Sequence, residues 1–84
     1  MATLTPIYVW RWGSGYGLRY ILFIVKDADT DDSVTVSELT AITDTVGIKM
    51  DDGSALTCTE ATNVVTITTA AMTDEDCLIL VSGD

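Results

Sequence analysis

The sequence has no histidine, and this absence excludes several kinds of site before any motif is considered. Catalysis that uses imidazole as a general acid or base is excluded, as is a zinc site built from cysteine and histidine. Basic residues are also scarce: four lysines and arginines stand against thirteen acids, so the formal charge is 4 − 13 = −9. Nucleic-acid-binding proteins need a basic face that replaces the counterions of phosphate. We therefore expect neither a histidine-based enzyme nor a nucleic-acid partner.

Long apolar runs are missing too. The longest covers Tyr20 to Val25, whereas a membrane-spanning helix needs about 20 residues. Residues 1–6 contain no basic residue, which predicts a soluble chain without a cleaved leader and without a membrane partner. With 84 residues the chain is too short for a second core, and its 48% hydrophobic content is too high for disorder. A single domain of this size often needs a disulfide, a metal ion or an oligomeric partner for stability.

The two cysteines, Cys58 and Cys77, lie in threonine-rich and apolar segments. In such segments a free cysteine behaves as a small buried hydrophobic residue. A disulfide between adjacent strands is the alternative, and the sequence leaves both interpretations open. A catalytic cysteine is not expected, because the chain has no histidine to activate it.

Charged and aromatic residues are distributed unevenly along the chain. All six aromatic residues fall within residues 8–23, and residues 1–26 carry three basic residues and no acid, a charge of +3. Residues 27–84 carry one lysine and all thirteen acids, a charge of 1 − 13 = −12. We therefore divide the single domain into an aromatic, basic N-terminal arm with the first strand (residues 1–17) and an acidic β-domain (residues 18–84). Attraction between the arm of one copy and the body of another predicts a homo-oligomer or a component of a lattice.

Fourteen threonines and many valines and isoleucines favour strands over helices. The expected strands cover residues 7–12, 18–26, 33–37, 46–50, 56–59, 63–68 and 77–81. The continuous apolar run within residues 18–26 predicts a central strand that is buried on both faces. Residues 37–46 are ambiguous, because Leu39, Ile42 and Val46 could also form the inner side of a short helix. The predicted fold is all-β, possibly with one short helix: a small antiparallel β-sandwich or barrel of about seven strands.

The acidic segment of residues 27–38 resembles an EF-hand calcium loop. Its acids at loop positions one, three, five and twelve are Asp27, Asp29, Asp31 and Glu38. Carboxylates at these positions can surround one calcium ion. Position six, however, holds Asp32 where the loop needs glycine, and no entering helix is expected before the loop. An acidic turn before a strand is the favoured interpretation, with calcium binding as the alternative, and no other cofactor is expected.

The N-terminal arm carries the candidate partner-binding residues. In a strand, Trp10 and Trp12 share one face while Arg11 points to the other. Tryptophan, tyrosine and arginine are enriched in the residues that dominate binding energy at interfaces. The candidates are Tyr8, Trp10, Arg11, Trp12, Tyr16 and Arg19. Since the tryptophans could equally be core residues, we expect one aromatic face in the core and the other against a partner.

Catalytic arrangements are not evident in the sequence. The Gly13-x-Gly15-x-Gly17 spacing leads into a strand and therefore lacks the helix N-terminus that binds phosphate. Acid pairs such as Asp51 and Asp52 lie at expected turns, where carboxylates are ordinarily solvated. We therefore expect no catalytic residues, and not an enzyme.

Three segments together carry a resemblance to a known class of proteins. They are residues 6–10 (Pro-Ile-Tyr-Val-Trp), residues 32–39 (Asp-Ser-Val-Thr-Val-Ser-Glu-Leu), and the closing strands within residues 63–68 and 77–84. With them the chain resembles the small β-rich virion proteins of tailed bacteriophages, especially capsid decoration, or cement, proteins. The resemblance implies a structural virion protein, assembled in the host cytoplasm, that clasps the major capsid protein and associates with copies of itself, commonly as a trimer.

Two functions are therefore expected. The first is capsid decoration through the N-terminal segment and self-association. The alternative is a calcium-binding β-module for adhesion or receptor binding, in a tail or on a cell surface.

Overall fold

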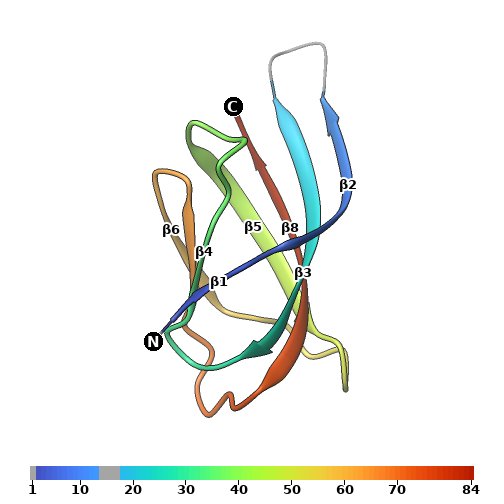
Figure 1. The fold of residues 1–84 in the computed structure, drawn as a ribbon, viewed down its shortest axis with the longest axis vertical. Helices are drawn as coiled ribbons and strands as arrows, with labels where there is room; N and C mark the ends of the chain where they lie inside the picture. The colour runs from blue at the N-terminus through green and yellow to red at the C-terminus, as the bar shows by residue number, and fades with distance from the viewer. Residues whose placement is uncertain (1, 14–17) are drawn as a thin grey trace.

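The computed structural model describes residues 2–13 and 18–84, which form eight strands in two four-stranded sheets and, within these ranges, no helix. The strands of the small sheet, in spatial order, are β1 (Thr3–Leu4), β4 (Ser33–Thr35), β7 (Val64–Ile67) and β6 (Cys58–Ala61). Those of the large sheet are β2 (Ile7–Gly13), β3 (Arg19–Ala28), β8 (Glu75–Gly83) and β5 (Ile42–Lys49). All pairings are antiparallel except that of β1 with β4 (Figure 1). The predicted all-β sandwich is confirmed.

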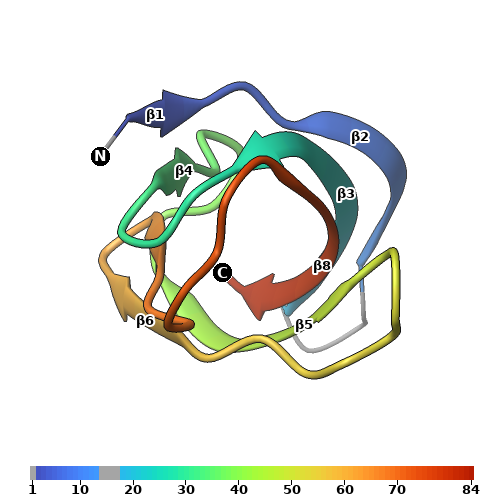
Figure 2. The same ribbon diagram turned by 90° about the horizontal axis from the view of Figure 1, so that it is seen from below.

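The core lies between the two sheets and is built by side chains that alternate along the strands. In β3, Ile21, Phe23 and Val25 point inward and are at most 2% exposed. The small sheet contributes Val65 and Ile67 from β7, which are fully buried. Figure 2, viewed along the long axis, shows both sheets curving around this shared interior. Alternation with a period of two thus sets which side chains reach the core.

A buried carboxylate links the start of the chain to the small sheet. Asp32 is the one charged residue buried among those described, at 2% exposure. Its Oδ1 accepts a hydrogen bond from the backbone N–H of Ala2 at 2.7 Å, and its Oδ2 accepts one from Asp29 N–H at 2.9 Å. Both oxygens are therefore satisfied, which offsets the cost of burying the charge.

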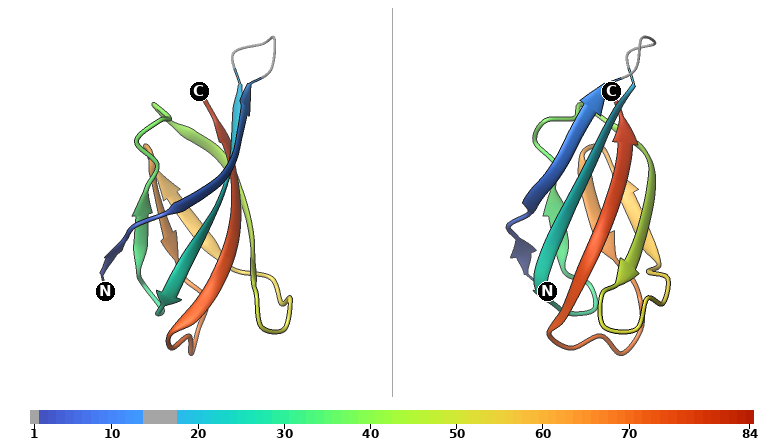
Figure 3. Two further views of the ribbon diagram at one scale, coloured as in Figure 1. Left: turned by 45° about the vertical axis from the view of Figure 1, so that its right-hand side comes forward. Right: turned by 90° about the vertical axis from the view of Figure 1, so that its right-hand side faces the viewer.

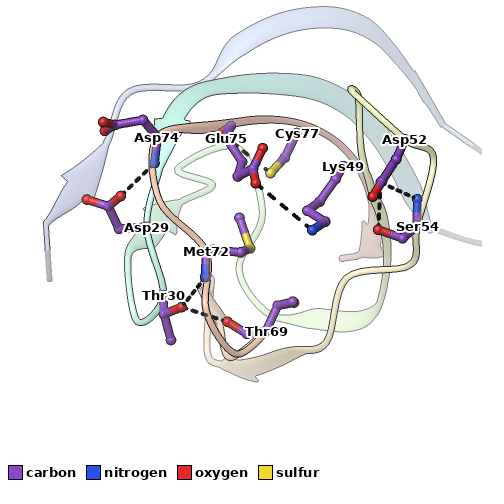
Figure 4. Close-up of polar contacts among 10 residues, drawn as sticks. All are labelled: Asp29, Thr30, Lys49, Asp52, Ser54, Thr69, Met72, Asp74, Glu75 and Cys77. Carbon is purple, nitrogen blue, oxygen red and sulfur yellow. Dashed lines mark hydrogen bonds and ion pairs between the residues drawn. The ribbon is translucent and has the colours of Figure 1, made fainter.

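Side chains tie together the loops at the lower end of the sandwich, as oriented in Figure 1. The Thr30 hydroxyl donates to the Thr69 carbonyl at 2.8 Å and accepts from Met72 N–H at 2.9 Å (Figure 4). Asp29 Oδ1 accepts from Asp74 N–H at 2.8 Å. These bonds hold the β3–β4 loop against the β7–β8 loop and close the core below Met72.

Three predictions about secondary structure need correction. Residues 37–41 form turns, and the segment that could have been a short helix is instead the first half of β5. Most of β5 pairs with β8, and its β-branched residues favour a strand. Together these effects outweigh the helical spacing of the apolar residues. β1 was not predicted, because two residues give no periodic signal.

Within the described residues, no helix could span a membrane.

The third correction concerns β3. The strand is central, between β2 and β8, as predicted. Its outward side chains, however, are only half-buried: among the described residues, no second layer covers Tyr20, Leu22 and Ile24. The prediction of burial on both faces is therefore wrong for the isolated chain, and this difference locates the candidate site.

Candidate protein-binding face

The outward side of the large sheet is apolar across all four strands. The strand register places Trp10, Leu22, Leu80 and Val46 in one row from β2 to β5. The flanking rows add further large side chains, and we call the whole set the outer apolar face: Ile7, Trp10, Trp12, Tyr20, Leu22, Ile24, Val46, Ile48, Leu78 and Leu80. The right panel of Figure 3 shows these four strands side by side, with no other strand in front of them.

Several of these side chains are unusually exposed for their size. Trp10 and Val46 are each 61% exposed, and Ile7 is 51% exposed. A shallow groove of about 180 Å³ runs over β3, β8 and β5, lined by Leu22, Val46, Gly47, Ile48, Leu78 and Leu80. Contiguous exposed apolar surface of this kind marks interaction sites in soluble proteins. The face therefore has the chemistry of a protein–protein contact.

Aromatic stacking fixes one margin of the face. Trp12 stacks on Tyr20 with ring centroids 5.4 Å apart and an angle of 14° between planes. Trp10 meets Trp12 edge to face at 6.3 Å. Such contacts restrain the rings before any partner binds. The rings then lose less side-chain entropy when a partner binds, which favours affinity.

The opposite side of β2 is used within the chain. A bulge between Tyr8 and Trp10 shifts the register, and Tyr8 packs edge to face on Phe23 at 6.2 Å. The Arg11 guanidinium lies 4.1 Å from the centre of the Tyr8 ring and forms an ion pair with Glu38. The face that carries Arg11 thus serves the fold.

The structure separates the six candidate partner-binding residues. Trp10 and Trp12 lie exposed on the outer apolar face, on the side of β2 away from Arg11, as the alternation predicted. Tyr8 packs against the core, and Arg19 donates a hydrogen bond to the Glu38 carbonyl at 3.0 Å. Tyr16 lies outside the described residues. Tyr8 thus lies against the core and the two tryptophans face outward, and the expectation that a partner covers the tryptophans stays a prediction.

Sequence reasoning missed the part of the face that lies on β5 and β8. Its members are Val46, Ile48, Leu78 and Leu80. The signal was present in Cys77 to Val81, where both alternating sets are apolar, as in β3. Continuous apolar strands of this kind are typical of sheets that are covered on both faces. In this chain the second cover is absent from the described residues.

The EF-hand-like segment does not gather its carboxylates. Asp29 and Asp32 accept backbone hydrogen bonds, as described above, and Glu38 lies against Arg11 at the other end of β4. In the part of the chain that the structure describes, no group of three or more acids or cysteines is placed to hold a metal ion. The geometry therefore gives the calcium-binding alternative no support.

The cysteines are free thiols, with Cys77 buried and Cys58 half-buried. Burial raises the pKa of both thiols from 9.0 to about 11, and the neighbouring Glu60 adds to the effect on Cys58. Both thiols are therefore protonated at neutral pH, and a protonated thiol is a poor nucleophile.

Comparison of the chain with protein-family models, curated proteins and solved structures gives no match. The functional argument therefore rests on the fold and the outer apolar face.

Proposed function

We propose that this chain is a structural virion protein of the capsid decoration, or cement, type, which binds the subunits of a capsid shell. The observation that carries the proposal is the outer apolar face. It spans four strands and has two restrained tryptophans at one margin. The sequence resemblance to decoration proteins supplies the kind of partner.

Attachment would bury the side chains of the outer apolar face that are most exposed. Trp10 lies on the edge strand β2 and, with Val46, has the largest exposed fraction among the described large apolar side chains. Buried tryptophans at interfaces often contribute about 2 kcal/mol or more each to binding. The two tryptophans thus serve as anchors, and the groove over β3, β8 and β5 receives apolar groups of the shell subunit.

Binding would also stabilise the protein itself. A domain of this size has a marginal core, and any partner that binds only the folded state raises its stability. A cement protein whose folded state is stabilised by the shell, and which stabilises the shell by binding to it, fits this thermodynamic coupling.

The test is co-sedimentation with phage shells assembled without this chain. The double substitution Trp10→Ala and Trp12→Ala should reduce binding at least about tenfold. The matched control is Thr35→Ala with Thr59→Ala, two exposed residues of the small sheet, which should bind like the unaltered protein. Equal binding by both pairs, or no binding by the unaltered protein, would contradict the proposal.

Point substitutions are preferable to deletion of the N-terminal segment. β2 pairs with β3 over its whole length and places Tyr8 against the core. Deleting residues 1–12 would therefore damage the fold and the binding face together.

A further inference from the structure

The outer apolar face differs from most protein surfaces in that charge lies only near its ends. Along β3 and β5, the alternation places Lys26 beyond one end of the rows and Asp44 in the last row at the other end, beside Ser82. Between them the rows hold apolar and aromatic side chains and one serine, Ser82. A surface of this kind matches a copy of itself as well as it matches any other apolar surface.

We propose that a second copy of this chain packs face to face on the outer apolar face, related by a two-fold axis, with the ends of the two molecules exchanged. The inference goes beyond the proposed function: in the free protein the second copy covers the face that the shell subunit covers after attachment, so the two partners exchange on that face. Two sheets that pack face to face lie about 10 Å apart, with strand directions within about 30° of each other. A two-fold axis makes such a contact closed, so that it gives dimers and no filaments.

The charge distribution selects the exchange of ends. The lower end, as oriented in Figure 1, carries an acidic group that lines one groove with Met50: Asp27, Asp51, Asp74, Glu75 and Asp76. At the upper end, Arg11 and Arg19 lie with Glu38 on the other side of the large sheet, and Asp44 lies on the outward side. If both copies pointed the same way, their acidic ends would lie together and repel each other.

Exchanging the ends removes that repulsion. The acidic end of each copy then lies beside the opposite end of its partner, and Lys26 on the outward side of one copy faces Asp44 of the other; the two-fold axis repeats this contact. Complementary charge at the rim sets the orientation and the rate of association, while burial of the apolar rows supplies the affinity.

A dimer would also cover the outward sides of β3 and β8. Their outward residues Leu22, Leu78 and Leu80 are half-buried in one copy and become covered in two. Both strands then have an apolar layer on each face, as their continuous apolar sequences predict. The sequence pattern therefore describes the dimer better than it describes the single chain.

The first test is sedimentation equilibrium of the unaltered protein, with a monomer mass of 9.0 kDa and an expected dimer of 2 × 9.0 = 18 kDa. The dimer should predominate at about 100 µM, where an interface of micromolar affinity is populated. Val46→Lys places two charges inside the contact and should raise the Kd at least about 100-fold. The matched control is Thr59→Lys, on the exposed side of the small sheet, which should leave the Kd unchanged.

Circular dichroism and thermal melting check that each variant is folded. If Val46→Lys does not fold, Val46→Thr keeps the β-branched shape and should still weaken the dimer, by about tenfold. A monomer at every concentration, or equal affinities for the Val46 and Thr59 variants, would overturn the inference.

The second test determines the orientation. Carboxyl-to-amine cross-linking of a mixture of ¹⁴N- and ¹⁵N-labelled protein identifies links between copies by mass spectrometry. Links from Lys26 or Lys49 of one copy to Asp44 or Asp84 of the other support exchanged ends. Links between copies that join these lysines only to acids of the lower end, such as Asp51, would overturn that orientation.

The two proposals fail separately. If the protein stays monomeric but binds shells through Trp10 and Trp12, the second-copy inference fails and the decoration function stands. If the dimer forms and neither dimer nor monomer binds shells, the inference stands and the proposed function fails.

Discussion

The outer surfaces of the two sheets differ in chemistry, although the sheets share one core. The outward side chains of the large sheet form the outer apolar face, whereas the small sheet turns hydroxyl groups outward: Ser33, Thr35, Thr59 and Thr66. Thr59 and Thr35 are exposed, and Val34 and Val65 between them are buried. In both sheets, side chains therefore alternate between the core and the outer surface. Only the outward-facing side chains differ in chemistry between the two sheets.

This difference indicates which sheet meets water. Leaving apolar area in water costs about 25 cal/mol for each Å², so an apolar outer face is retained where a partner removes that cost. A threonine face is solvated at no such cost and keeps the strand preference of β-branched residues. The outer surface of the small sheet thus suits contact with water, and that of the large sheet is the surface that the proposed partners would cover.

The largest expected effect compares neighbouring residues of β8 that point to opposite sides. Ile79 is fully buried in the core, and Leu80 is half-buried on the outer apolar face. Ile79→Ala should lower the free energy of unfolding by about 2–5 kcal/mol, since it leaves a cavity in the core. Leu80→Ala should cost about 1 kcal/mol in the monomer.

Urea unfolding at about 1 µM protein, where association is minimal, measures both values. Equal losses for the two substitutions would show that the outer face is already buried in the monomer and would remove the contrast between the sheets.

The next effect concerns the buried carboxylate beside the small sheet. Asp32→Asn replaces an acceptor by an N–H₂ group that meets a backbone N–H donor, either that of Ala2 or that of Asp29. An unsatisfied buried donor costs about 1–3 kcal/mol, and the loss should appear in urea unfolding. Asp31→Asn, exposed in the same loop, is the matched control and should change stability by less than about 0.5 kcal/mol.

A pH effect tests the interior that both sheets share. Because the pKa of Cys58 and of Cys77 is raised from 9.0 to about 11, the unfolded chain releases these protons first as pH rises. The stability that the protonated thiols contribute is complete below pH 9 and is lost between pH 9 and pH 11. Thermal melting across this window should show the decline, with a smaller slope in Cys58→Ala. An identical slope in that variant would assign the decline to other groups.

The smallest expected effect concerns the ion pair that joins the turn after β4 to β2. Glu38→Gln removes the charge that faces Arg11, but both side chains are largely exposed, at 38% and 50%. Exposed pairs contribute about 0–1 kcal/mol, so the urea midpoint should barely move. A loss of about 2 kcal/mol or more would show that this contact, and not the core alone, holds the two sheets together.

The sequence predicted the strands with strong alternation and missed features that depend on neighbours. β7 and β8 were located correctly, because valine, isoleucine and cysteine recur with a period of two. The helical alternative for residues 37–46 arose because Leu39, Ile42 and Val46 fit both periods, and pairing with β8 decided between them. The bulge after Tyr8 left no signal in the sequence, since it depends on register with β3.

The candidate site was predicted only in part for the same reason. Trp10 and Trp12 could be identified by residue type, which signals an interface independently of the fold. Val46 and Leu80 are ordinary strand residues, and they become site residues only because the register aligns them with Trp10.

The central position of β8 has a consequence for biosynthesis. It is the last of the eight strands to be translated, yet it lies between β3 and β5, and most of the pairing of the large sheet passes through it. Until Gly83 has left the ribosome, β3 and β5 expose unpaired edges as well as apolar side chains, which is the state most prone to aggregation. Folding of the large sheet is therefore completed after translation of β8. Chains that terminate before β8 should be recovered as aggregates or be degraded.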